Sequence, residues 1–134
     1  MKCLIVEDNA AMRRLLRRFV MEHAIDVYES SNGLEAINQY AQVQPDCVLM
    51  DIELPGQNGL HATRQIKAIY PQANILIVTS YDDPELRQAA QVAGACGYVL
   101  KENLQELRSW LIRRVAAEST LQRDLPRAEK GSLQ

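Results

Sequence analysis

Four short apolar runs, separated by segments with helical periodicity, most constrain how this 134-residue chain can fold. They are residues 3–6, 47–50, 75–78 and 98–100. The first three contain no charged or amide side chain, as is typical of central strands in a parallel sheet that is covered on both faces. Residues 25–30 instead alternate apolar and polar side chains, which predicts an edge strand with one face in water.

Amphipathic helices are predicted in the intervals between these strands. Apolar residues recur at helical spacing in five segments, namely residues 10–23, 33–42, 57–70, 84–93 and 103–117. Strands and helices that alternate and connect through right-handed crossovers give a doubly wound α/β fold. The wet second strand and the short fifth strand predict a five-stranded parallel sheet in the order 2-1-3-4-5. Helical spacing also assigns Leu34, Ala41 and Ile69 to buried helix faces.

The globular part is predicted to span residues 1–117, and residues 118–134 are expected to form a polar tail or the start of a linker. The apolar runs are too short to span a membrane, and no secretory signal is visible. A formal charge of −2 gives the chain itself no net electrostatic reason to bind nucleic acid. Two of the three cysteines lie in predicted core strands, which indicates buried, reduced thiols and a cytoplasmic protein.

Polar residues follow the predicted strands at the point where each strand ends. Glu7 and Asp8 follow the first strand, Asp51 the third, Thr79 the fourth and Lys101 the fifth. The carboxyl ends of parallel strands share one edge, where open α/β sheets bind ligands, so these side chains are expected to lie together. Carboxylates about 4 Å apart repel by about 4 kcal/mol at an effective dielectric near 20, so the three acids would take up protons or bind a cation. Hard carboxylate oxygens on a partly hydrated edge favour Mg²⁺.

With a metal ion bound, one carboxylate can attack a phosphoryl donor and form an aspartyl phosphate. Asp51 is the best nucleophile because it ends a central strand between the acid pair and Thr79. Lys101 and the Thr79 hydroxyl would then donate to phosphoryl oxygens. The sequence therefore predicts a magnesium-assisted phosphoryl site at this edge of the sheet.

This set of residues, together with Tyr98 three positions before Lys101, resembles the receiver domain of two-component response regulators. Pro55 and Gly59, which follow the candidate phosphoacceptor, and the segment 94–98 also match the family. Each motif alone is commonplace, and the resemblance depends on their shared order, spacing and strand context over residues 1–117. It implies a flavodoxin-like, CheY-like three-layer sandwich.

The resemblance implies a role for each position of the site. Asp51 would accept a phosphoryl group from a histidine kinase. Mg²⁺ would be held by Glu7, Asp8, Asp51 and the backbone carbonyl of Glu53. The phosphoryl group would be contacted by Thr79, Ser80 and Lys101. Tyr98 would move inward after Thr79, and the surface formed by the fourth helix, fifth strand and fifth helix would change shape.

Two further positions tune dephosphorylation in the family, and here they are Glu53 and Tyr81. A bulky Tyr81 beside the phosphoryl group would hinder attacking water, whereas Glu53 would help to orient it. The working hypothesis is a long-lived phosphoryl group.

Residues 79–101 look most like the receivers of LuxR/NarL-type transcription regulators, which carry a DNA-binding helix-turn-helix domain after the receiver. About seventeen residues follow residue 117 here, too few for such a domain. The chain is therefore expected to be either the receiver part of a longer LuxR-type regulator, which is favoured, or a stand-alone response regulator that acts through protein contacts. Homodimerisation on phosphorylation is a further expectation, through a face that the sequence does not specify.

Enzymes with external substrates fit the chain less well. A phosphatase with an aspartyl nucleophile is a weaker alternative, since the chain has no room for the cap that shapes a substrate pocket. A nucleotide-binding module is disfavoured because no Gly-rich loop follows the first strand. The chain is thus interpreted as a signalling domain that catalyses only its own phosphoryl transfer and dephosphorylation.

Overall fold

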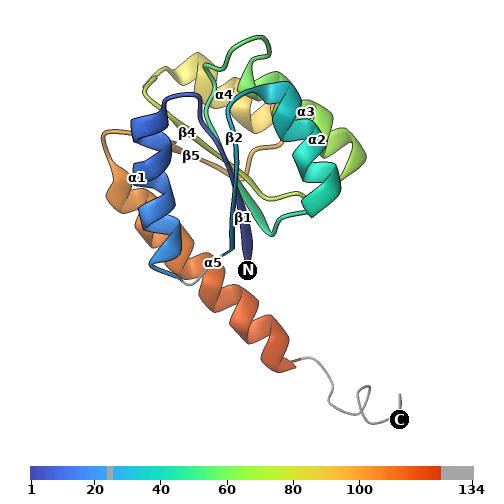
Figure 1. Ribbon diagram of the computed structural model, residues 1–134, viewed down its shortest axis with the longest axis vertical. Coiled ribbons are helices and arrows are strands. Elements are labelled where there is room, and N and C mark those ends of the chain that lie inside the picture. The colour runs from blue at the N-terminus through green and yellow to red at the C-terminus, as the bar shows by residue number, and fades with distance from the viewer. Residues whose placement is uncertain (24–25, 125–134) are drawn as a thin grey trace.

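The computed structural model describes residues 1–23 and 26–124 as a five-stranded sheet between two layers of helices (Figure 1). Strands and helices alternate along the chain as β1 (Lys2–Val6), α1 (Ala10–Met21), β2 (Asp26–Ser30), α2 (Gly33–Val43), β3 (Cys47–Met50), α3 (Gly59–Ile69), β4 (Ile75–Thr79), α4 (Pro84–Ala93), β5 (Gly97–Leu100) and α5 (Leu104–Asp124). All strand pairs are parallel, and the strand order is β2-β1-β3-β4-β5. The predicted α/β fold and sheet order are confirmed.

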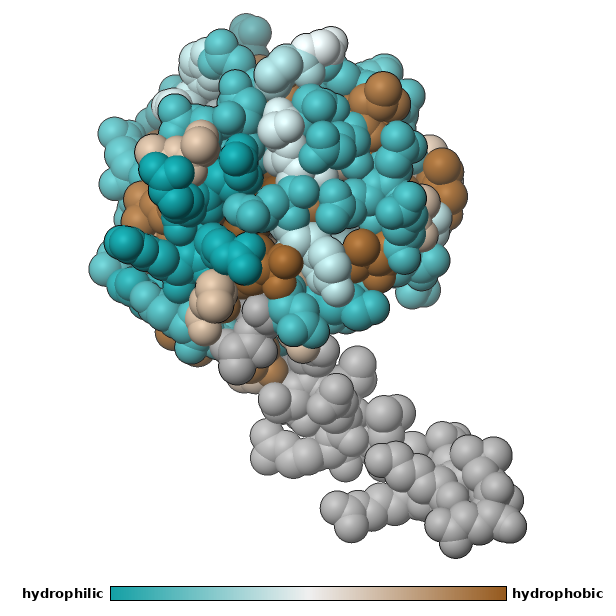
Figure 2. All heavy atoms as spheres, in the orientation of Figure 1, coloured by the Kyte–Doolittle hydropathy of each residue, from teal (hydrophilic) through white to brown (hydrophobic). Residues whose placement is uncertain are grey.

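The apolar strands supply two cores because alternate side chains point to opposite faces of the sheet. Leu4 and Val6 of β1 pack with α2, α3 and α4, whereas Cys3 and Ile5 pack with α1 and α5. Figure 1 shows the same division, with α1 and α5 on one side of the sheet. Cys3 and Cys47 are buried free thiols, as predicted. Figure 2 shows mostly hydrophilic residues on the viewed surface, with hydrophobic ones in small separate groups.

Side-chain caps start four of the helices. The side chains of Asn9, Asn32, Asn58 and Asp83 accept hydrogen bonds from backbone N–H groups in the first turns of α1, α2, α3 and α4. Such caps satisfy donors that have no partner inside the helix, and each contributes about 1 kcal/mol. They therefore fix the residue at which each of these helices begins.

Three residues assigned to buried helix faces are exposed instead. Leu34 is 62% exposed, Ile69 is 66% exposed, and Ala41 also lies on the surface. Ala36 of α2 and Ala62 of α3 are fully buried in their place. Small residues at these central positions let each helix lie close to the sheet, so the larger side chains at the margins of the stripe remain in water.

The last helix runs past its predicted end at residue 117 as far as Asp124. Residues 118–124, predicted as part of a polar tail, therefore continue α5, and the rest of that predicted tail lies outside the described residues. No glycine or proline occurs between Leu104 and Asp124, so the sequence offers no stop signal there. In the described ranges, no helix combines the length and the apolar composition that crossing a membrane requires.

Candidate functional site

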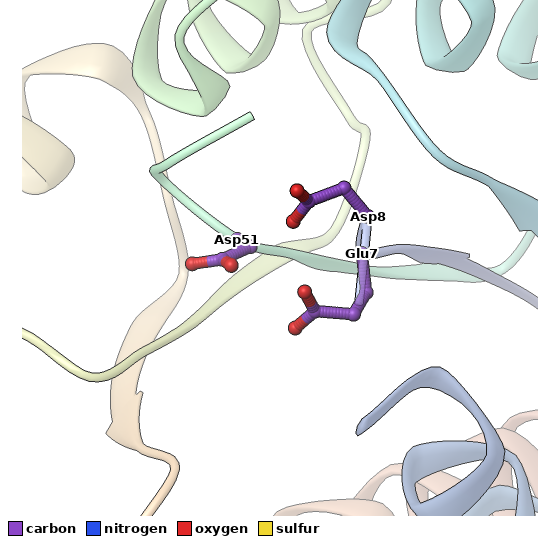
Figure 3. Close-up of side chains that lie close together, drawn as sticks. All are labelled: Glu7, Asp8 and Asp51. Atoms are coloured by element: carbon purple, nitrogen blue, oxygen red, sulfur yellow. The ribbon is translucent and has the colours of Figure 1, made fainter. Parts of the chain in front are cut away.

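Three carboxylates meet between β1 and β3, the two central strands where the strand order reverses. Glu7 and Asp8 follow β1, Asp51 follows β3, and one oxygen from each lies within 4.8 Å of the others. Figure 3 shows the three side chains directed toward a common space. Glu7 is 1% exposed and Asp51 is buried, whereas Asp8 is exposed to solvent. The structure thus gathers the acids where ligands bind to sheets of this topology.

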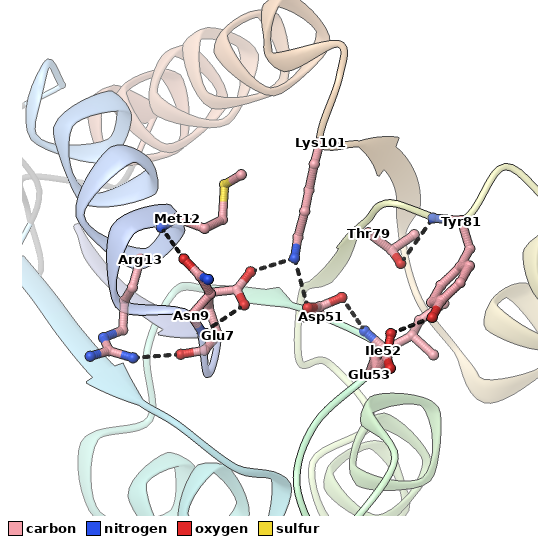
Figure 4. A network of polar contacts seen from close by, with 10 residues as sticks. All are labelled: Glu7, Asn9, Met12, Arg13, Asp51, Ile52, Glu53, Thr79, Tyr81 and Lys101. Atoms are coloured by element: carbon pink, nitrogen blue, oxygen red, sulfur yellow. Dashed lines mark hydrogen bonds and ion pairs between the residues drawn. The ribbon is translucent and has the colours of Figure 1, made fainter.

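Lys101 bridges two of these acids from the loop after β5. Its Nζ lies 2.7 Å from Glu7 Oε1 and 2.8 Å from Asp51 Oδ2 (Figure 4). Burial would lower the pKa of Lys101, but the contacts of its ammonium with the Asp51 and Glu7 carboxylates outweigh burial and raise the pKa. The ammonium therefore stays charged. Three carboxylates and one ammonium leave the cluster with a net charge of −2 when all four groups are ionised.

Glu7 is held at each of its polar groups. Its backbone N–H donates to the Ser30 carbonyl at 3.0 Å, and its carbonyl accepts from Arg13 Nη1 at 2.8 Å. Its Oε2 accepts from the Asn9 backbone N–H at 3.1 Å, while Oε1 faces Lys101. Burial raises the pKa of Glu7, and the negative charge of Asp51 adds to the rise, against the lowering effect of Lys101 and Asn9.

Asp51 is fixed where the loop that connects β3 to α3 begins. Its Oδ1 accepts from the Ile52 backbone N–H at 2.8 Å, and Gly59 N–H donates to the Ile52 carbonyl at the same distance. A Cβ atom at Gly59 would lie 1.8 Å from the Asp51 carbonyl oxygen. Only glycine allows the start of α3 to approach so closely. The matching glycine in the sequence therefore has a direct steric role in placing Asp51.

The donor set of the cluster fits Mg²⁺. All three side chains offer carboxylate oxygens, and the net charge of −2 calls for a divalent cation. Mg²⁺ prefers hard oxygen ligands and keeps several bound waters. Because Asp8 is exposed to solvent, water can reach a metal ion bound there. The carboxylates of Glu7, Asp8 and Asp51 are therefore the candidate metal ligands. The backbone carbonyl of Glu53 remains a predicted fourth oxygen.

The predicted switch residues lie beside the cluster on β4 and β5. Thr79 is fully buried, and its Oγ1 accepts from the Tyr81 backbone N–H at 3.4 Å. Ser80 is exposed next to it. Among the contacts of the described residues, Thr79 makes no hydrogen bond to Asp51. The Tyr98 hydroxyl donates to the Tyr81 carbonyl at 2.6 Å, and the guanidinium carbon of Arg87 lies 4.6 Å from the centre of the Tyr98 ring.

Tyr81 also connects to the loop after β3. Its hydroxyl donates to the Glu53 carboxylate, a hydrogen bond that raises the pKa of Tyr81. A chain of contacts thus runs from Tyr98 through Tyr81 to Glu53, two residues after the candidate phosphoacceptor. Figure 4 shows the part of this chain between Tyr81 and Glu53. The sequence identified the three positions separately. Their connection depends on the adjacency of β3, β4 and β5, which only the sheet topology provides.

The raised pKa of Glu7 predicts a pH-dependent stability. A carboxyl group whose pKa is raised in the folded state stabilises the protein most below its ordinary pKa of about 4.3, and this contribution is lost as the pH rises through the raised pKa. In the absence of Mg²⁺, the free energy of unfolding should therefore decrease with increasing pH over that window. Because Mg²⁺ binds the ionised acid, its affinity should increase over the same window.

Urea unfolding at a series of pH values, with and without Mg²⁺, measures both trends. Glu7→Gln is the control, because the glutamine amide does not titrate. The contribution of Glu7 to the pH dependence of the free energy of unfolding should therefore disappear in this variant. An unchanged slope in Glu7→Gln would assign the pH dependence to other groups.

Fold and site together define a doubly wound α/β domain with an acidic, lysine-bridged site at its switch point. The sequence pattern of the family described as "Response regulator receiver domain" matches residues 3–112. The match covers most of the chain, and the chain belongs to this family.

Known relatives include both a chemotaxis protein and transcriptional regulators. The chain is 40% identical over 98 residues to the chemotaxis protein CheY of Halobacterium salinarum, which covers 73% of this chain and 82% of the relative. It is 37% identical over 108 residues to the uncharacterized transcriptional regulatory protein YhcZ of Bacillus subtilis, covering 79% of this chain and 50% of that protein. The chain thus spans half the length of YhcZ.

Solved structures agree with this fold. The crystal structure of a DNA-binding response regulator of the LuxR family from Staphylococcus aureus matches with a TM-score of 0.77 at 29% identity. The match covers 85% of this chain and 97% of that one. LuxR-family regulators are therefore among the structural neighbours, as the sequence led us to expect.

Proposed function

We propose that this chain is a phosphorylation switch in which Asp51 accepts a phosphoryl group from a histidine kinase. The observation that best supports the proposal is the Lys101 ammonium, which lies within 2.8 Å of both Asp51 and the buried Glu7. A cation held against the nucleophile can neutralise the charge that arrives with a phosphoryl group. The buried, free thiols of Cys3 and Cys47 suit the reducing cytoplasm, which we assign as the location.

In the proposed transfer, a carboxylate oxygen of Asp51 forms a bond to phosphorus as the bond from phosphorus to the kinase imidazole breaks. The imidazole leaves with the electron pair and takes up a proton. Mg²⁺, when bound by Glu7, Asp8 and Asp51 with the Glu53 carbonyl, would neutralise charge on the phosphoryl oxygens. Lys101 would exchange its contact with Asp51 Oδ2 for a phosphoryl oxygen, and Thr79 with Ser80 would contact another.

The proposed signal leaves the site through Thr79 and Tyr98. Thr79 Oγ1 accepts from Tyr81, so rotation of Thr79 toward a phosphoryl group would alter the loop that Tyr98 contacts. Tyr98 lies on β5, where Arg87 of α4 covers its ring, and it lines a surface pocket together with residues of α5. We assign the output to this surface. Ala90 and Ala93 are the fully buried residues of α4, and such small side chains hold the helix by little apolar area.

For the output, we favour the receiver part of a LuxR-type transcription regulator. Two observations support this choice. The chain matches the structure of a LuxR-family response regulator, and it spans half the length of the transcriptional regulatory protein YhcZ. In that case DNA would be bound by another domain and not by this chain, and phosphorylation would promote a homodimer. A stand-alone regulator is the second candidate, supported by the match to 82% of a CheY protein.

Intact mass after incubation with acetyl phosphate tests the proposed function. The wild type should gain one phosphoryl group in the presence of Mg²⁺ and none after chelation of the metal ion. A folded protein that binds Mg²⁺ but gains no mass would contradict the proposal, and would leave a binding module that works without phosphorylation.

Tyr81 is expected to protect the phosphoryl group from water. Its hydroxyl donates to Glu53, two residues after Asp51, so the Tyr81 side chain connects the loops after β3 and β4. Tyr81→Ala should therefore shorten the phosphoryl half-life severalfold, as measured by loss of the phosphorylated mass after removal of the donor. Tyr81→Phe keeps the ring and loses the hydrogen bond, so it separates shielding by the ring from anchoring by Glu53. A half-life that is unchanged in Tyr81→Ala would refute the protective role, and a wild-type half-life of only seconds would contradict a long-lived phosphoryl group.

A further inference from the structure

Arg13, in the second turn of α1, reaches back to the strand end that carries the acid pair. Its Nη1 donates to the Glu7 carbonyl at 2.8 Å, and its Nε lies 3.6 Å from Glu29 Oε1 on β2. The side chain is mostly covered, with 25% of its surface exposed. One guanidinium thus ties α1, β2 and the end of β1 together. Figure 4 shows Arg13 on the opposite side of Glu7 from Lys101.

The bond to the Glu7 carbonyl differs in kind from the other contacts of Glu7. Ser30 fixes the N–H of Glu7, while Asn9 and Lys101 fix its carboxylate. The carbonyl belongs to the peptide group that joins Glu7 to Asp8, which is planar and rotates as a unit. Rotation of this peptide would move both candidate metal ligands at once. Among the contacts of the described residues, the guanidinium of Arg13 is the side-chain group that fixes its orientation.

We propose that Arg13 is a positioning residue for the metal site, which it serves by fixing the peptide between Glu7 and Asp8. The inference rests on the proposed function, because it takes Glu7 and Asp8 as ligands of Mg²⁺. Glu29 orients the planar guanidinium through its contact with Nε, while Nη1 donates to the Glu7 carbonyl. The arginine therefore gives the metal site a rigid support from α1 without contacting the metal ion.

Arg17 provides a matched control one turn further along α1. Its Nη1 lies 3.3 Å from Glu29 Oε2, so it shares the acid that Arg13 contacts. In the described part of the chain, it makes no hydrogen bond to Glu7. Replacement of either arginine removes one positive charge and one contact with Glu29. Only replacement of Arg13 releases the Glu7 carbonyl.

The sign of the effect separates positioning from simple charge. Removing a positive charge near the acid cluster reduces its repulsion of Mg²⁺, so a purely electrostatic role predicts tighter binding in both variants. Positioning predicts weaker binding in Arg13→Met, because the two ligands lose their common orientation. A merely structural role would lower the stability of both variants alike and leave the Mg²⁺ affinity of each unchanged.

The test is the dissociation constant for Mg²⁺, measured by titration calorimetry on the full chain. Urea unfolding of each variant in the absence of metal measures its stability separately. Arg13→Met should weaken Mg²⁺ binding about fivefold or more, a change of the size expected for one hydrogen bond. Arg17→Met should bind Mg²⁺ as tightly as the wild type or slightly more tightly. Wild-type or tighter binding in Arg13→Met would overturn the proposal.

Arg13→Lys keeps the charge and decides the question if Arg13→Met does not fold. A single ammonium cannot span the Glu7 carbonyl and Glu29 as the planar fork does, so binding should be at least about twofold weaker. Wild-type affinity in Arg13→Lys would count against positioning. A different result would contradict the proposed function, namely a wild type that binds Mg²⁺ but takes up no phosphoryl group. That result would not affect the comparison of Mg²⁺ affinities between the Arg13 and Arg17 variants.

Discussion

Asp51→Asn should fold like the wild type and take up no phosphoryl group from acetyl phosphate. The amide has the shape of the carboxylate, so its oxygen can still accept from the Ile52 backbone N–H and leave the loop to Gly59 undisturbed. It has no anionic oxygen to attack phosphorus, so uptake should be abolished. Intact mass in the presence of Mg²⁺ measures the uptake, and circular dichroism checks the fold.

Asp8→Asn is the matched control for Asp51→Asn. It removes one charge from the same cluster but leaves the nucleophile and Lys101 in place. Phosphorylation should persist in this variant and require a higher Mg²⁺ concentration. Peptide mapping then locates the modified residue in each protein. A phosphoryl group on another carboxylate in Asp51→Asn would refute Asp51 as the acceptor.

Much of the fold could be predicted from two sequence patterns, the continuous apolar runs and the segment that alternates apolar and polar residues. Continuous apolar runs such as residues 47–50 need cover on both faces, and they became the central strands. The alternating segment became β2 at the edge, with its only buried residue at Ser30. The order of the strands then brings residues 7, 8 and 51 together, so the acid cluster followed from topology alone.

Other features depend on packing that the sequence pattern does not contain. Helical spacing could not distinguish Leu34 from Ala36 as the buried residue of α2, because the choice depends on how close the helix lies to the sheet. In the sequence, nothing distinguishes Arg13 from the three other arginines at positions 14, 17 and 18 of the same helix. Its role at the Glu7 carbonyl needs the angle between α1 and β1. The bond from Tyr81 to Glu53 likewise needs the positions of two loops.

The second large effect is expected from Lys101→Met, which should destabilise the protein most when Mg²⁺ is absent. The lysine side chain is 16% exposed and its partners, Glu7 and Asp51, are nearly inaccessible. Methionine fills similar space and leaves the two carboxylates facing each other without a cation. Removing one partner of a buried ion pair costs about 3–5 kcal/mol. We expect about 3 kcal/mol at neutral pH, since a proton taken up by Glu7 would relieve part of the repulsion.

Mg²⁺ should restore much of this loss, because it replaces the missing positive charge at the same acids. A ligand that binds only the folded state stabilises it in proportion to the logarithm of its concentration over the dissociation constant. The variant cluster has one more unit of net negative charge, so it should bind Mg²⁺ more tightly than the wild type. Urea unfolding of both proteins, with and without millimolar Mg²⁺, gives the free energy of unfolding in each condition.

Lys67→Met separates this effect from the general loss of a lysine. Lys67 Nζ donates to the carbonyls of Pro71 and Ala73, so its replacement removes hydrogen bonds but no contact with an acid. The loss of stability in Lys67→Met should be the same with and without Mg²⁺. In Lys101→Met, a deficit below about 1 kcal/mol would show that the ion pairs are screened by solvent. A larger deficit that Mg²⁺ leaves unchanged would mean that Lys101 acts by packing and that the acids do not form a metal site.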